Sequence, residues 1–275
     1  MALGPYAEAT GNGSLAAGAV SKATGQNSIA IGSGSQSTGT DSFSAGYNSA
    51  ATAANALALG SSASATAVGS YAAGLKATAS GTNAMALGTL STATNTDSWA
   101  AGYNAQATGI NATALGNKSL SSALDSFAAG VGSQATATNA LAFGTGALAS
   151  GITGSAIGYS SSAIGSNSIA IGSLSSASGN DSAAFGYKAT TTSANDLAIG
   201  TQAVAGGPHA IAIGSSANGY GDGAIAMGYN ASASGTNAIA IGRGAIADGN
   251  NAFAIGVNAV ADGDDSFAFG DGADT

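Results

Sequence analysis

The residue types that usually perform acid–base, nucleophilic or metal chemistry are nearly absent from this sequence. It contains a single histidine, His209, and no cysteine. Serine is abundant, but no base accompanies it, so a serine nucleophile would have no group to accept its proton. The glycine-rich segment 219–223 is not followed by a predicted helix, as a phosphate-binding loop would be. We therefore predict no enzyme activity, no catalytic residue and no cofactor, and we interpret His209 as a turn residue beside Pro208.

Aromatic side chains provide one candidate for ligand contact. Five of the eight tyrosines directly follow a glycine that recurs every 14 residues. These candidate ligand-contact residues are Tyr47, Tyr103, Tyr159, Tyr187 and Tyr229. Because they would line one bend in a shared register, they could stack on a protein or glycan partner. The alternative is that the rings lie flat across neighbouring bends as covers.

Acidic residues near the end of the sequence raise the question of a metal site. Segments 248–251 and 262–265 contain Asp and Asn in matching columns, so their side-chain oxygens would stack about 4.8 Å apart at one bend. A calcium ion would relieve the repulsion between such carboxylates. We favour the alternative of a solvated acidic bend and assign no metal ligand.

A column of threonine and serine, which begins at Thr10, suggests a third binding mode. A flat ladder of hydroxyl groups could bind ice. The column is interrupted at Ile164, Gly206 and Tyr220, and its neighbouring positions are mixed. We favour bend hydroxyls that bond to the backbone and keep ice binding as a minor alternative.

Charge and hydropathy exclude several classes of partner. Charged residues make up 7% of the chain, against about 25% in an ordinary soluble domain, and the net charge is −8. Five cations argue against nucleic acid, which requires clustered Lys and Arg. No run of 18 apolar residues predicts a transmembrane helix, and no signal peptide opens the chain. Export and membrane attachment would therefore require segments outside this sequence.

A repeat of 14 residues determines which elements position these side chains. A glycine recurs at this interval from Gly4 to Gly270 without insertion, in twenty copies. Ala stands two residues before it in all copies but one, where Ser44 replaces it, and Ala or Ser stands three residues after it. Asn, Asp or Gly stands five residues before it in nearly every copy, with Thr153 and His209 as the departures. Repeats of this kind predict an array of equivalent stacked units.

Each repeat predicts one coil of a β-solenoid. Segments 28–31 and 35–37 alternate in side-chain type with period two, which indicates two short strands. The Gly and Asn/Asp columns mark two bends, because these residues tolerate positive φ. A helix is excluded by the missing apolar stripe, and collagen by the spacing of the glycines. We predict an all-β fold with parallel strands and a single domain, residues 1–275, of about 19–20 repeats.

The first strand of each coil leaves open which residues face inwards. Its large residues, such as Ile29 and Ile31, flank an alanine that points the opposite way. If the large pair lay inside, the near-invariance of an outward alanine would have no reason. We favour the alternative in which alanine lies inside a thin coil, where overpacking costs about 1–3 kcal/mol. The stripe of Ile, Leu and Phe outside would then need burial against other copies of the chain.

The sequence resembles a known family of repeats. Asn27–Ser35 and Asn167–Ser175 are similar to the motif Asn-Ser-Val-Ala-Ile-Gly-x-x-Ser in the heads of YadA-like trimeric autotransporter adhesins. The resemblance implies a left-handed parallel β-roll, three copies of which pack around a threefold axis. It also implies a Gram-negative surface adhesin whose stalk and outer-membrane anchor lie outside this fragment. No neck or heptad stalk follows Gly270, and Met1 fits inside the repeat, so we expect a piece of a longer head.

These observations define the expected assembly and function. We predict an obligate homotrimer and an adhesin head that attaches a bacterium to host extracellular matrix or host cell surfaces. The alternatives are a structural spacer rod of a surface or phage tail fibre and, less favoured, an ice-binding solenoid. In the first half of the chain, coils whose large-residue positions hold one aromatic residue and one alanine alternate with coils that hold two mid-sized residues there. This alternation keeps the side-chain volume of each layer nearly constant, as a packed core requires. The predicted trimer core consists of Ile29, Ile31, Phe43, Leu57, Leu59, Tyr71, Trp99, Phe127, Ile169, Ile171, Ile211, Ile213, Ile239, Ile241, Phe267 and Phe269.

Overall fold

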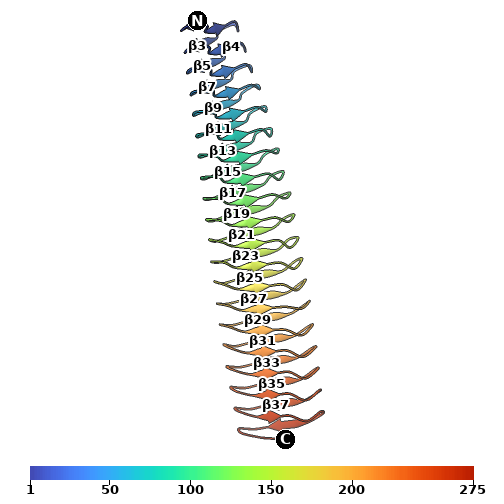
Figure 1. The fold of residues 1–275 in the computed structure, drawn as a ribbon. Coiled ribbons are helices and arrows are strands. Elements are labelled where there is room, and N and C mark those ends of the chain that lie inside the picture. The colour runs from blue at the N-terminus through green and yellow to red at the C-terminus, as the bar shows by residue number, and fades with distance from the viewer. The chain divides into compact units, whose positions relative to one another are not determined.

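The computed structural model describes residues 1–275 as an all-β chain of short parallel strands without a helix. It therefore has no helix of the length and apolarity needed to cross a membrane. A three-residue strand and a two-residue strand alternate, separated by bends, in coil after coil (Figure 1). The chain divides into a first unit, Met1–Asn139, and a second unit, Ala140–Thr275.

Both units contain the same two kinds of strand. The first unit contains β1 (Ala2–Leu3), β2 (Glu8–Ala9), β3 (Leu15–Ala17), β4 (Lys22–Ala23), β5 (Ile29–Ile31), β6 (Gln36–Ser37), β7 (Phe43–Ala45), β8 (Ala50–Ala51), β9 (Leu57–Leu59), β10 (Ser64–Ala65), β11 (Tyr71–Ala73), β12 (Thr78–Ala79), β13 (Met85–Leu87), β14 (Thr92–Ala93), β15 (Trp99–Ala101), β16 (Gln106–Ala107), β17 (Thr113–Leu115), β18 (Leu120–Ser121), β19 (Phe127–Ala129) and β20 (Gln134–Ala135). The second unit contains β21 (Leu141–Phe143), β22 (Leu148–Ala149), β23 (Ser155–Ile157), β24 (Ser162–Ala163), β25 (Ile169–Ile171), β26 (Ser176–Ala177), β27 (Ala183–Phe185), β28 (Thr190–Thr191), β29 (Leu197–Ile199), β30 (Val204–Ala205), β31 (Ile211–Ile213), β32 (Asn218–Gly219), β33 (Ile225–Met227), β34 (Ser232–Ala233), β35 (Ile239–Ile241), β36 (Ile246–Ala247), β37 (Phe253–Ile255), β38 (Val260–Ala261) and β39 (Phe267–Phe269).

Within each unit, strands pair with their equivalents in the adjacent coils. Met85 of β13 pairs in parallel with Trp99 of β15, and Thr92 of β14 pairs with Gln106 of β16. The three-residue strands thus form one sheet and the two-residue strands a second sheet. Because the pairing shift equals the repeat length, each column of the sequence becomes a ladder of stacked residues, which is nearly uniform where alanine occupies it. This confirms the predicted parallel β-solenoid.

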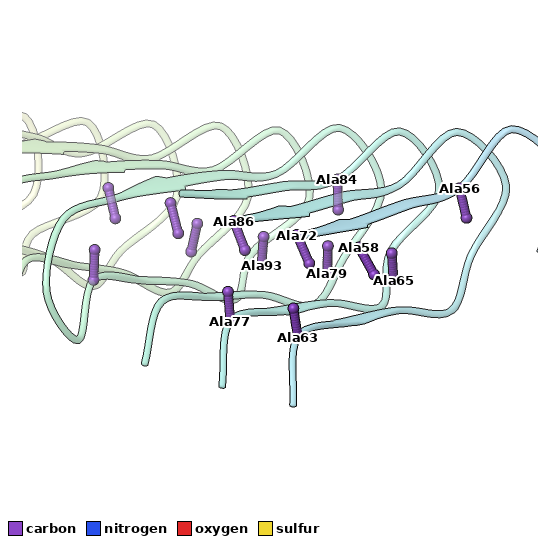
Figure 2. Close-up of a cluster of buried hydrophobic side chains, with 14 of the residues drawn as sticks. Ala56, Ala58, Ala63, Ala65, Ala72, Ala77, Ala79, Ala84, Ala86 and Ala93 are labelled. Atoms are coloured by element: carbon purple, nitrogen blue, oxygen red, sulfur yellow. The ribbon is translucent and has the colours of Figure 1, made fainter. Parts of the chain in front are cut away.

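The interior between the two sheets is filled by side chains of alanine and serine. Ala86 on β13 and Ala93 on β14 have no exposed surface, and the other central alanines of these strands are equally buried. Figure 2 shows methyl groups from both sheets directed into the same narrow space. Met85 and Leu87, which flank Ala86, lie on the outer side of the sheet. The interpretation that alanine faces inwards and the large pair outwards is confirmed.

Several serines in this interior have hydrogen-bond partners, whereas the buried hydroxyls of Ser14, Ser44, Ser168 and Ser266 have none. The hydroxyl oxygens of Ser37 and Ser42 lie 2.6 Å apart, and those of Ser121 and Ser126 are also 2.6 Å apart. At the bends, serine hydroxyls bond to a carbonyl three residues earlier, as Ser35 Oγ does to Gly32 at 2.8 Å. Burying a hydroxyl without a partner costs free energy, so these bonds lower the cost of serine at the positions that have them.

Two bends close every coil, and both require positive φ. We call the recurring glycine and the two residues after it the Gly bend, and residues six to nine after that glycine the Asn bend. Gly88 has a φ of 125°, and a Cβ added there would lie 2.6 Å from the carbonyl oxygen of Gly102 in the next coil. Asn83 and Asp97, which end successive Asn bends, have φ values of 54° and 55°. The Asn/Asp preference of this column therefore reflects a left-handed backbone.

The two bends predict different responses to substitution of glycine. Gly88→Ala should destabilise the chain by at least about 1–3 kcal/mol, because the new Cβ meets rigid backbone and the φ is unfavourable for alanine. Gly69→Asn should stay within about 0.5 kcal/mol. Gly69 ends an Asn bend, and its added Cβ would meet only the movable side chain of Asn83. Urea-unfolding midpoints of the two variants test this, and equal losses would contradict it.

Candidate interaction surfaces

The outward side chains of the three-residue strands form a ladder of large apolar residues on each unit. We call this surface the apolar face; Leu57 and Leu59 of β9 are a typical pair. All sixteen residues predicted for the trimer core lie on it, and none of them is buried in the single chain. Phe253 and Phe267, one coil apart, stack with ring centroids 4.8 Å apart. Each unit of a single chain therefore presents an apolar face to its surroundings.

Trp99 illustrates how much of this face is open. It lies on β15 between Met85 and Thr113 of the neighbouring strands, and 43% of its surface is exposed. Its partner on the same strand is Ala101, as expected from the alternation of ring and methyl group. Apolar patches of more than a few hundred square ångströms on soluble proteins mark sites of interaction.

The five tyrosines lie where the sequence predicted, on the Gly bend in one register. Between 46% and 60% of the surface of each is exposed. In the second unit, hydroxyl residues occupy the intervening coils: Ser173 follows Tyr159, and Thr201 follows Tyr187. Lys188 Nζ lies 5.3 Å from the ring centroid of Tyr187, which places a cation against this aromatic ring. The rings are thus available for stacking in the single chain.

Carboxylates of the Asn bend are paired with amides, a feature that the sequence analysis missed. Asn27 Nδ2 donates to Asp41 Oδ1 at 2.9 Å, and Asn111 donates to Asp125 at 2.8 Å. Each other Asp at this position likewise has Asn one coil earlier. The signal was visible as an Asn 14 residues before each Asp. The remaining acceptors are Asp97, Asp181 and Asp265.

In the acidic segments 248–251 and 262–265, Asp264 and Asp265 follow the same rule, whereas Asp248 accepts from the hydroxyl of Ser234. Asp264 Oδ1 accepts from the backbone N–H of Asn250 at 2.8 Å and from its side-chain amide at 3.1 Å, and Asp265 accepts from Asn251. The chain contains no group of three or more His, Cys, Asp or Glu side chains placed to hold a metal ion. These two carboxylates thus face amide donors from the coil below.

His209 and Asp196 are the unusual ionisable groups. His209 has a φ of 61° and ends an Asn bend, so it is the turn residue that the sequence predicted. Asp196 was missed, although it interrupts a column otherwise made of Ser, Ala and one Gly. It is 2% exposed; its carboxylate accepts the N–H groups of Ser193 at 2.8 Å and Ala210 at 3.1 Å. Burial raises its pKa above the ordinary 3.8, and these hydrogen bonds and His209 oppose that rise.

Comparison with known proteins agrees with this geometry. The chain matches the YadA head domain repeat family over residues 1–63, 65–91, 93–119, 121–147, 149–217, 220–245 and 247–273. The chain therefore belongs to the YadA head domain repeat family. This is a class of non-enzymatic adhesin heads that are exposed on bacterial surfaces. The resemblance noted in the sequence is confirmed.

One solved structure similar to this chain is the crystal structure of the collagen-binding domain of the Yersinia adhesin YadA. The two are 24% identical over 59% of this chain and 67% of that chain, with a TM-score of 0.26. No curated protein matches the chain.

Asp196 predicts an unusual dependence of stability on pH. Because its pKa is raised in the fold, the folded chain takes up a proton at a higher pH than the unfolded chain. The buried carboxylate thus destabilises the fold at neutral pH, and this loss is recovered as the pH falls through the raised pKa. Asp196→Ser, which introduces a residue common in this column and cannot place an amide donor against Ser193 or Ala210 N–H, should therefore melt above the wild type at neutral pH, and the difference should shrink toward pH 3.8. Asp222→Asn, at an exposed position, is the control; a difference independent of pH would contradict the assignment.

Proposed function

We propose that this chain is the binding head of a bacterial surface adhesin, which attaches the cell to host extracellular matrix or host cell surfaces without chemical conversion. Membership of the YadA head repeat family supports an adhesin-type function. The observation that carries the proposal is the stacking itself, because equivalent outward positions of successive coils lie side by side in one register. Contacts that are weak in one coil then add up along a repetitive ligand.

The apolar face supports assembly into a homotrimer. The interior is filled by methyl and hydroxymethyl groups, so the Ile, Leu, Phe and Trp side chains lie outside the coil. Burial of a large apolar side chain contributes about 1.5–3 kcal/mol, which this chain can gain only between molecules. We assign the sixteen predicted core residues to that contact and the adhesive role to the remaining surface.

Within that surface, we assign ligand contact first to the tyrosines of the second unit, Tyr159, Tyr187 and Tyr229. They are exposed, share one register and are separated by hydroxyl residues. Aromatic side chains supply large contact areas with little loss of rotamer freedom and dominate many interfaces. Tyr47 and Tyr103 hold the same position in the first unit.

Replacing Tyr159, Tyr187 and Tyr229 together by serine should weaken ligand binding at least about tenfold. The expectation follows because each aromatic anchor of an interface contributes more than about 1 kcal/mol, and 1.4 kcal/mol corresponds to a factor of ten. The measurement is a solid-phase screen of the chain against fibrillar collagen, other matrix proteins, glycans and host cells, followed by titration of the positive ligand.

The matched control replaces three partly exposed serines on the two-residue strands of the same unit, Ser162, Ser176 and Ser232, by alanine. This triple variant should bind like the wild type. If the wild type bound nothing in the screen, the spacer rod would replace the adhesin as the function, and thermal hysteresis of the solution would favour ice binding. If both triple variants lost binding equally, the tyrosine assignment would be wrong.

The trimer predicts that Trp99 is shielded in solution. Trp99→Ala should cost about 3–5 kcal/mol for each buried ring, and the loss should appear as dissociation of the trimer. Light scattering measures the oligomer, and quenching of tryptophan fluorescence measures the exposure of the ring. Gln106→Ala, on the outer side of β16, should change neither quantity. Detection of a stable, folded 25.4 kDa monomer would contradict the proposed trimer.

A further inference from the structure

Across the Gly bends from Gly32 to Gly130 in the first unit, the residue after the glycine varies in step with the residue before it. Where alanine precedes the glycine, an apolar residue follows, and where isoleucine or leucine precedes it, a small polar residue follows. The apolar followers include Tyr47, Leu75, Tyr103 and Val131. The polar followers are Ser33, Ser61, Thr89 and Asn117. The alternation has a period of two coils and holds without exception between Gly32 and Gly130.

This alternation keeps the apolar volume at the edge of the apolar face nearly constant. An apolar follower such as Leu75, which is 48% exposed, compensates for the methyl group of Ala73. Solvent exerts no such constraint, whereas a close-packed contact does. A partner that stays in register with such a contact over several coils must be built of stacked coils with the same rise. A second copy of this chain is such a partner.

The opposite edge of the first unit has apolar residues that a solvent-exposed bend does not need. Val68, Ile110 and Leu124 lie on Asn bends, eight residues after a recurring glycine, and are 44–51% exposed. Elsewhere in this unit the position holds Asn, Gln, Thr or Ala. These three residues belong to coils 60–131, the same part of the chain that contains Leu75 and Tyr103 on its Gly bends.

At the bends of the first unit, cations lie on one edge and acidic residues on the other. Lys76 and Lys118 lie on Gly bends, which contain no acidic residue in this unit. Asp97 and Asp125 lie on Asn bends, which contain no cation. Lys22, the remaining cation of the unit, lies on a strand 3.6 Å from Glu8. Opposite charges on opposite edges favour contact between unlike edges of two copies.

We propose that, in the assembled head, the Gly bend of each copy packs against the Asn bend of the next copy around the ring. The inference rests on the homotrimer proposed above. Rotation about an axis along the stacked coils places unlike edges of neighbouring copies side by side. Such a heterologous contact forms a closed ring when three copies complete the rotation. Because this rotation does not shift the copies along the axis, Leu75 then packs near the partner's Val68, and Tyr103 packs near the partner's Ile110. The first-unit tyrosines serve assembly, and ligand contact is left to the second unit.

Cysteine cross-linking tests this contact directly, because the chain has no cysteine of its own. Tyr103→Cys and Ile110→Cys in one chain place two thiols at opposite bends of the same coil. Under mild oxidation, or with a short bismaleimide, this double variant should run as a covalent trimer on a denaturing gel. Either single variant should stay monomeric on the gel, because unlike edges meet. Val68→Cys with Leu75→Cys is a second pair with the same expectation.

Tyr103→Cys combined with Thr92→Cys is the matched control, because Thr92 lies on the outer sheet and should not reach a partner. Light scattering of each variant before cross-linking distinguishes the possible failures. A trimer in which neither bend pair is linked would overturn the contact and leave the proposed trimer intact. Cross-linking of the Thr92 control as efficient as that of the bend pairs would also overturn it. A folded monomer would overturn the trimer and this inference together, while ligand binding is measured separately.

Discussion

The space between the two sheets of a coil admits almost no side chain larger than alanine or serine, and the other features of the molecule follow from that limit. Ala86 and Ala93 face each other from opposite sheets with no exposed surface. A coil this thin cannot enclose an isoleucine or a phenylalanine, so those residues lie on the outer side. The backbone approaches the next coil so closely at Gly88 that even a methyl group would collide with it.

A fold of this kind separates two tasks that a globular domain combines. Backbone pairing and small side chains hold the coil in shape, while large apolar side chains remain for contacts between molecules. The bends turn the chain, because only they contain residues with positive φ, and they also carry most of the charges. The apolar face, the Gly bend and the Asn bend can therefore serve different partners without disturbing the shared interior.

Most of the coil was predictable from the sequence because stacking repeats each local preference. The strands, the bends and the inward alanine appear as columns, and His209 was correctly placed at a bend by its column alone. The burial of Asp196 could have been predicted from its column, whose other members are small and almost all buried, but the backbone N–H groups that receive its carboxylate could not. The hydrogen bond from the Asn27 amide to Asp41 can be predicted only by recognising that residues 14 apart in the sequence stack in successive coils. The role of the tyrosine row in ligand contact stays a prediction, because ligand contact imposes no repeating residue pattern that the sequence would reveal.

The two-coil alternation on the first unit also bears on how such a head changes length during evolution. Because each coil contacts mainly its immediate neighbours, whole coils can be gained or lost without disturbing distant ones. Loss of one 14-residue coil between Phe43 and Phe127 would preserve the backbone pairing but bring two coils of the same type together. Loss of 28 residues would preserve both. Recombination within this region should therefore leave lineages that differ by even numbers of coils.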